Sequence, residues 1–467
     1  MSQSTPVRIA VAAVAAVGLI GGVHTAGAAQ TEEGPTVTPI AAAAGKGHPV
    51  AGVAGLADLP GYTELEYLMS GEADTYQQDG SWTENGKWAT RVASQGNSYT
   101  TRLLVERPTD PAKFNGTVIV EWLNVSFGVD IPVDLSQSYE HFTRAGYAYV
   151  GVTAQKRGAD KLRALDPARY PGVDISDDAL SYDILTQAAQ AVRTRPELLG
   201  GATPSVVLAS GHSQSAGRLT TYANAIQPTA NAFDGFLVHG RGGGAAPIST
   251  GVSAPARAKI RTDLRVPVFV LQSETDIVTS AAVRQNTERV RTWEVAGTAH
   301  ADKHGLDLYD AINARDHAIN DGAPTTCDKP VNNMPSRYAQ NAAYHHLDQW
   351  VRRGVAPPVA PMIESLFGVF VVRDGDQNAR GGVRLPDLDA PVATYAPRNS
   401  GGNVLGACLL LGSTTPFSPA RLTARYPDHD AYVRAFTTAA DRARDAGYLL
   451  PQDHAEALAR ARAADIP

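Results

Sequence analysis

From residue 116 onward, apolar runs of strand length alternate with amphipathic stretches of helix length, and no other feature constrains the fold more. Continuous apolar runs are typical of parallel strands buried on both faces, and the helices between them supply the crossovers. The pattern therefore predicts an α/β protein with a mostly parallel central sheet flanked by helices. The runs that we expect to form its strands are residues 117–122, 147–153, 205–209, 233–238, 266–271 and 292–295.

The segments on either side of this pattern have a different character. Residues 62–108 show short alternating runs separated by turn residues, which predicts an antiparallel edge of the sheet. A helix over residues 339–351 would close the parallel part, and more than a hundred residues follow it. In a chain of 467 residues we therefore expect a core domain over residues 58–353. A C-terminal extension of strands and helices over residues 354–467 would pack on this core.

The N-terminus has the pattern of an export signal. Arg8 precedes an apolar run over residues 9–23, and small residues ending in Ala28 and Ala29 follow it. This order is what signal peptidase recognises, although an uncleaved membrane anchor is the alternative because the run approaches the length of a spanning helix. We expect a secreted protein, cleaved near Ala28 or Ala29, with no stable membrane span after cleavage. The expected segments are a signal peptide over residues 1–29 and a flexible leader over residues 30–57.

Charge and cysteine content narrow the classes of function. The net charge is −6 and the basic residues form no run, which argues against a nucleic-acid partner. The two cysteines, Cys327 and Cys408, are expected to form a disulfide in an exported protein, with two unrelated buried thiols as the alternative. So few thiols, and no histidine spacing typical of zinc, predict that the protein has no metal site.

The motif Gly211-His212-Ser213-Gln214-Ser215 lies directly after one predicted strand and before a helical pattern. This context is that of a nucleophile elbow, a strained turn that exposes a serine and needs small residues two positions before and after it. We expect Ser213 to be the nucleophile and the backbone N–H of Gln214 to be one oxyanion donor. Ser215 is the alternative nucleophile, and a Gly-Ser turn without chemistry is the third interpretation.

A serine nucleophile needs a base and an orienting acid, which in this arrangement follow it in the order acid, then histidine. Asp276 follows the strand predicted over residues 266–271, and Glu274 is the alternative acid. His300 follows the last predicted strand and a Gly turn, and His304 is the alternative base.

Positions at the carboxyl ends of strands suggest a second oxyanion donor and two pocket residues. The second oxyanion donor is expected to be the backbone N–H of Asn124 or Val125, in the loop after the first parallel strand. His239 and Arg241 are expected to line the substrate pocket, because they come at the carboxyl end of a strand, where such folds bind ligands. The glycine-rich stretch that follows them resembles an oxyanion loop, but it comes after the nucleophile in the chain, so we do not assign it that role.

With these residues placed, the chain resembles the family of alpha/beta hydrolase domain proteins from about residue 60 to near its C-terminus. The resemblance implies an α/β-hydrolase fold that includes the C-terminal extension, and a serine hydrolase mechanism without metal or other cofactor; it does not name a substrate. Family members commonly have Gly where this chain has Ala216. The similar stretches are residues 114–126, 146–152, 211–215, 272–276, 341–348 and 381–386.

Together these features predict a secreted hydrolase that cleaves a small-molecule or lipid-like carboxylic ester through an acyl-enzyme intermediate. Three alternatives stay open at this point. The acyl-enzyme could be resolved by an alcohol, which would make the protein an acyltransferase, or the bond cleaved could be an amide. The protein could also be a non-catalytic binding protein of the cell surface, although such a scaffold has no physical reason to keep the serine, the acid and the histidine in order.

Overall fold

The computed structural model describes residues 34–404 and 406–466, and within them the chain forms one compact unit built on a nine-stranded sheet. The signal peptide expected over residues 1–29, with its cleavage site, lies outside the described residues, as do the first residues of the expected leader. No helix among the residues described is long and apolar enough to cross a membrane.

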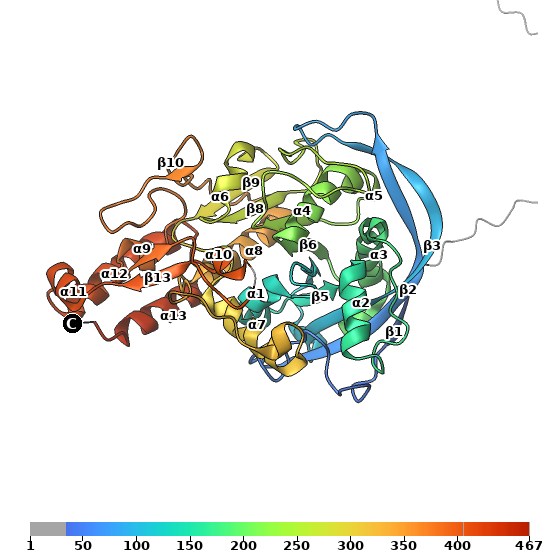
Figure 1. The fold of residues 1–467 in the computed structure, drawn as a ribbon, viewed down its shortest axis with the longest axis horizontal. Coiled ribbons are helices and arrows are strands. Elements are labelled where there is room, and N and C mark those ends of the chain that lie inside the picture. Colours follow the sequence, from blue (N-terminus) through green and yellow to red (C-terminus); the bar gives the residue numbers. More distant parts are fainter. Residues whose placement is uncertain (1–33, 405, 467) are drawn as a thin grey trace, which may run out of the picture. The chain divides into compact units, whose positions relative to one another are not determined.

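The sheet has the strand order β1-β2-β3-β5-β4-β6-β7-β8-β9 (Figure 1). From β5 to β9 all neighbours are parallel, and almost every residue of these strands is buried, which is why their sequences are mostly apolar. The predicted mostly parallel α/β-hydrolase sheet is confirmed. The strands are β1 (Thr36–Pro39), β2 (Tyr62–Asp79), β3 (Ala89–Pro108), β4 (Thr117–Trp122), β5 (Ala148–Val152), β6 (Val206–His212), β7 (Gly235–His239), β8 (Val268–Ser273) and β9 (Val290–Val295).

The antiparallel edge expected over residues 62–108 is a long hairpin of β2 and β3, and β3 joins it to the parallel part through β5. A buried ion-pair network ties this hairpin to the loop before the first helix. Arg102 of β3 lies 3.0 Å from Glu66 of β2 and 2.8 Å from Asp130, and all three side chains are almost completely buried. This network therefore fixes the β2–β3 hairpin to the loop that precedes α1.

Helices cover both faces of the sheet. Because side chains alternate along a strand, Thr117 and Glu121 of β4 share one face, while Trp122 belongs to the other. Thr117 bonds to Asp348 of α8 and Trp122 packs edge-on against Tyr182 of α3, so α8 and α3 lie on opposite faces. The helices of the core are α1 (Val133–Ala145), α2 (Lys156–Leu165), α3 (Ser181–Thr194), α4 (Gln214–Thr221), α5 (Gln227–Ala230), α6 (Ile277–Ser280), α7 (Lys303–Asp316) and α8 (Ser336–Arg353).

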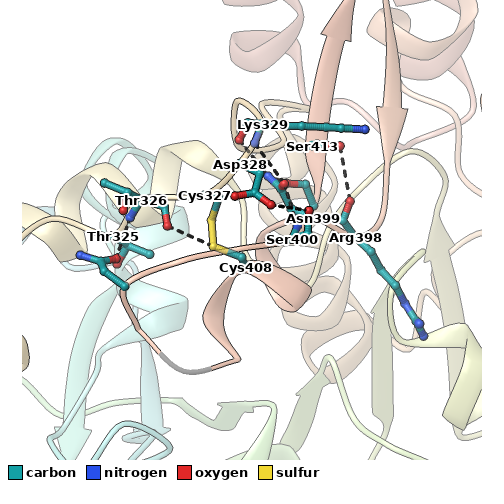
Figure 2. Close-up of a disulfide and its surroundings, with 12 residues drawn as sticks. Thr325, Thr326, Cys327, Asp328, Lys329, Arg398, Asn399, Ser400, Cys408 and Ser413 are labelled. Carbon is teal, nitrogen blue, oxygen red and sulfur yellow. Dashed lines mark hydrogen bonds between the residues drawn. A yellow bond between two sulfur atoms is a disulfide. The ribbon is translucent and has the colours of Figure 1, made fainter.

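The C-terminal segment packs on this core through buried apolar side chains, polar contacts and one disulfide. Asp453 of its last helix accepts hydrogen bonds from Arg144 of α1 and Asn341 of α8. The disulfide expected between Cys327 and Cys408 is formed (Figure 2). The elements of this segment are β10 (Ser365–Leu366), β11 (Phe370–Val371), α9 (Pro386–Asp389), β12 (Ala393–Ala396), α10 (Ala407–Leu411), β13 (Ser413–Pro416), α11 (Pro419–Arg425), α12 (His429–Asp445) and α13 (Pro451–Arg462).

Candidate active site

Ser213 occupies the turn between β6 and α4, and its backbone is strained. Its φ of 61° and ψ of −115° lie in a region that residues other than glycine rarely adopt. The turn is held because the Ser213 amide donates to the carbonyl of His239 on the neighbouring strand, at 2.9 Å. A Cβ at Gly211 would lie 3.1 Å from Ser215 Cβ and from a side-chain carbon of Leu219, so a larger residue there would crowd the turn. The local sequence thus forms the elbow that its pattern predicts.

Ser215 lies in the first turn of α4 and is fully buried. Its hydroxyl donates to the carbonyl of Leu123 at 3.3 Å. Ser213 is half-buried and lines the cavities described below, whereas Ser215 points into the protein. Of the two candidate nucleophiles, only Ser213 is placed to meet a substrate.

His300 and Asp276 form a close pair at the carboxyl end of the parallel strands. His300 Nδ1 lies 2.6 Å from Asp276 Oδ1, and the other oxygen of Asp276 accepts from the amide and the hydroxyl of Ser273 at 2.9 and 2.7 Å. Burial alone would raise the pKa of Asp276, but the neighbouring His300 and these hydrogen bonds hold it below its ordinary value of 3.8. The carboxylate therefore stays ionised and fixes Nδ1, which leaves Nε2 as the ring nitrogen that can take a proton.

Ser213 and His300 line the same two cavities. No hydrogen bond joins the Ser213 hydroxyl to the His300 ring in the part of the chain that the structure describes. Contacts of this kind are often long without substrate and shorten when it binds. The candidate nucleophile and the candidate base thus line the same space.

The alternative acid and base are engaged elsewhere. Glu274 accepts from Arg373 at 2.6 Å and from the Gly297 amide at 2.9 Å, and burial raises its pKa against the influence of Arg373. His304 lies on α7, where its ring stacks on Tyr139 with centroids 5.8 Å apart. Neither residue lines a cavity with Ser213.

The expected oxyanion donors are only partly available. The Gln214 amide belongs to the first turn of α4, where amides have no acceptor within the helix. The Asn124 amide, in contrast, donates to the Ile131 carbonyl at 3.2 Å, so the expectation for this N–H needs correction. The Val125 amide has no acceptor among the described residues, which makes it the better candidate for the second donor.

The two residues expected to line the pocket behave differently. His239 binds Asp134, with 2.9 Å between Nδ1 and Oδ1, and borders a small cavity beside His300. Arg241 is fully buried and donates to backbone carbonyls of the glycine-rich stretch, including Gly242 at 3.0 Å. Burial lowers the pKa of Arg241 to about 10. Arg241 therefore organises this loop and does not face the substrate, which corrects the expectation.

His212 is a neighbour of the site that sequence reasoning did not assign a role. Its ring lies between those of His239 and His300, with centroids 4.5 and 4.3 Å away, and its Nε2 is 3.0 Å from the His300 carbonyl. Burial, together with the two flanking histidines, lowers the pKa of His212 well below its ordinary value. The motif places His212 next to Ser213 in the chain. The partners of His212 are His239 on β7 and His300 in the loop after β9, and only the strand order of the sheet brings these residues together.

Two cavities meet at Ser213 and His300. The first, which we call the apolar cavity, measures about 110 Å³ and lies under α7 and α10. The second, which we call the wide pocket, measures about 540 Å³ and opens past Asp276 toward Thr279 and Arg398. Among the described residues no group of three histidine, cysteine, aspartate or glutamate side chains could hold a metal ion.

Comparisons with known proteins were made for both the structure and the sequence. The search of solved structures found a putative dienelactone hydrolase from Klebsiella pneumoniae, at 15% identity, covering 53% of this chain and 97% of the other, with a TM-score of 0.29. It also found a thermostable esterase from Pseudomonas putida, at 14% identity, covering 47% and 66%, with a TM-score of 0.27. A third match is a fungal esterase from Rhizomucor miehei, at 11% identity, covering 61% and 85%, with a TM-score of 0.33. At such identities and scores these likenesses say nothing about activity.

Of the two sequence comparisons, one found no match and the other identified a family. No curated protein matches the sequence. The model of the alpha/beta hydrolase domain family matches residues 33–459, which is nearly the whole chain. The chain therefore belongs to the alpha/beta hydrolase domain family.

Proposed function

We propose that this protein is a secreted serine hydrolase that cleaves carboxylic esters, with Ser213 as nucleophile, His300 as base and Asp276 as orienting acid. The observation that carries the proposal is the strained turn of Ser213, which faces the same cavities as an imidazole whose Nδ1 is fixed by a buried carboxylate. A strained serine turn persists only where its surroundings hold it, and such strain concentrates at active sites.

The geometry supports a two-step acyl transfer. His300 Nε2 takes the proton of the Ser213 hydroxyl as Ser213 Oγ attacks the ester carbonyl, and Asp276 stabilises the imidazolium. The amides of Gln214 and Val125 donate to the developing oxyanion, aided by the N-terminal end of α4. His300 then gives its proton to the leaving alcohol. In the second step it activates a water molecule, which attacks the acyl carbon and releases the acid and Ser213.

Export rests on the sequence of the first 29 residues and is supported by the disulfide, which persists in oxidising compartments. N-terminal sequencing of the protein recovered from the culture medium tests this part of the proposal. We expect the mature chain to begin directly after Ala28 or Ala29. A cell-bound protein with an intact N-terminus would favour the membrane anchor instead.

The first experiment on mechanism is labelling of the folded protein with a fluorophosphonate, followed by peptide mapping. We expect one label, on Ser213, which disappears in Ser213→Ala and remains in the matched control Ser215→Ala. A label on Ser215 would contradict the assignment of the elbow, and no label on folded protein would favour a non-catalytic binding protein. Product analysis with added glycerol separates hydrolysis from acyl transfer, and p-nitrophenyl esters compared with the matching anilides separate ester from amide cleavage.

A further inference from the structure

The two cavities that meet at Ser213 differ in chemistry as well as in size. The apolar cavity has no aspartate, glutamate, lysine or arginine among its lining residues. Its walls come from three distant parts of the chain: Phe127 and Ile131 after β4, Leu306 on α7, and Ala407 and Leu411 on α10. A charged group placed there would lose its hydration without gaining an oppositely charged acidic or basic partner, which is unfavourable. The cavity therefore suits an uncharged hydrocarbon group.

The wide pocket has a more polar wall. Gln214, Thr275 and Thr279 line it, and the exposed Arg398 stands at its edge. It is also about five times larger than the apolar cavity, with about 540 against 110 Å³. This pocket can admit water and release an alcohol while the other cavity stays occupied.

The two steps of acyl transfer make different demands on the two sides of an ester. The acyl group stays bound to the serine through both steps, whereas the alcohol must leave and water must enter in its place. An enclosed, dry site suits the group that stays, and an open site suits the groups that exchange. On the basis of the proposed function, we propose that the apolar cavity is the acyl site and that the substrates are esters of short, uncharged aliphatic carboxylic acids.

The disulfide fixes the far wall of this cavity and so limits the acyl chain. Cys408 lies on α10 directly after Ala407, and Cys327 lies two residues after Thr325, which also lines the cavity. Figure 2 shows the bridge joining the segment of Thr325 to α10. Since both wall segments are covalently joined, the cavity has a set depth. Acyl chains that fit the cavity gain favourable packing against its walls, whereas longer chains clash with the far wall.

A series of p-nitrophenyl esters from acetate to decanoate, with hemisuccinate as a charged match for butyrate, tests the proposal. We expect kcat/KM to rise with chain length, to reach a maximum and then to fall, with hemisuccinate at least about tenfold below butyrate. Ala407→Phe fills the cavity and should lower kcat/KM for the best chain at least about tenfold more than it lowers kcat/KM for acetate. Leu409→Phe is the matched control, because Leu409 lies on the same helix but faces the wide pocket, and it should leave the chain-length profile unchanged.

Leu306→Trp fills the cavity from the opposite wall, so the test does not depend on the folding of one variant. If both filling variants keep the wild-type profile while acetate is still cleaved, the acyl chain binds elsewhere and the proposal is overturned, although the esterase function stands. Hemisuccinate cleaved as fast as butyrate would overturn it in the same way. If no ester is cleaved and a small fluorophosphonate leaves Ser213 unlabelled, the proposed function itself fails, and this proposal fails with it.

Discussion

Replacement of both disulfide cysteines by serine should destabilise the protein by an amount that the loop length sets. Cys327 and Cys408 are 81 residues apart in the chain, and the loop that they close includes α8. In the chain-entropy model, opening a loop of this size releases an unfolded-state entropy equivalent to about 4.5 kcal/mol at 25 °C. Domains are commonly stable by only about 5–15 kcal/mol, so the loss is a large part of the total.

Urea unfolding, followed by tryptophan fluorescence, measures this loss. We expect the free energy of unfolding to fall by about 4.5 kcal/mol in the double serine variant and the slope with urea to rise, because the uncrosslinked unfolded chain exposes more surface. Wild type in reductant should unfold like the variant, and reductant should not affect the variant. Below its transition the variant should still cleave an acetate ester, since Ser213, Asp276 and His300 lie outside the bridged segments.

A loss below about 1 kcal/mol, with the bridge verified in the wild type by thiol titration, would refute the entropic reasoning. It would mean that the unfolded chain keeps the two segments together without the bridge. An unchanged slope of the unfolding free energy against urea concentration would also indicate that the unfolded chain stays compact without the bridge.

Three further outcomes follow from buried charged and titratable groups. Asp276→Asn should lower kcat about 10³- to 10⁴-fold, because the imidazole loses its fixed tautomer, and should leave the circular dichroism spectrum unchanged. Glu274→Gln should keep kcat within about tenfold and lower the melting temperature. His141 is buried with neither ring nitrogen bonded among the described residues, and burial lowers its pKa well below 6.5. Below about pH 6.5 the His141 imidazole therefore binds a proton in the unfolded chain but not in the folded one. The free energy of unfolding then falls with acidification by up to about 1.4 kcal/mol per pH unit. His141→Phe should reduce this pH dependence, measured by urea titrations at several pH values. Arg102→Met leaves the buried Asp130 without its cation, while Glu66 keeps Arg169, and it should cost about 3–5 kcal/mol in the same assay. Loss of the exposed cation in Lys303→Ala should stay within about 0.5 kcal/mol.

The features that the sequence predicted correctly depend on residues that are neighbours in the chain. A strand was expected over residues 205–209, and residues 206–209 lie in β6, because a strand buried on both faces is mostly apolar. The turn at Ser213 could be predicted for the same reason, since its constraint acts between residues that are neighbours in the chain. The α/β-hydrolase fold and the family followed from such signals.

Where the sequence left a choice open or misled, a contact with a residue outside the local motif was decisive. Glu274 and Asp276 are two residues apart and equally acidic, but Arg373, from 99 positions further along, binds Glu274 and leaves Asp276 to the histidine. The amide of Asn124 looked free as a loop residue, yet the returning chain at Ile131 accepts its hydrogen bond.

The sequence by itself thus determined the parallel strands, the strained serine and the order of the three candidate catalytic residues, because backbone geometry and strand burial depend on neighbouring residues. It did not predict β1, which lies in the segment expected to be a flexible leader. Only the tertiary structure decided which carboxylate meets His300, that Arg241 turns inward to bind carbonyls, and that α10 forms a wall of the apolar cavity. Those outcomes depend on packing contacts that reach beyond the local motifs: Asp276 and His300 are 24 residues apart, and Arg241 binds the carbonyl of Ala258, 17 residues further along. No local pattern encodes that packing, and the fold sets it as a whole.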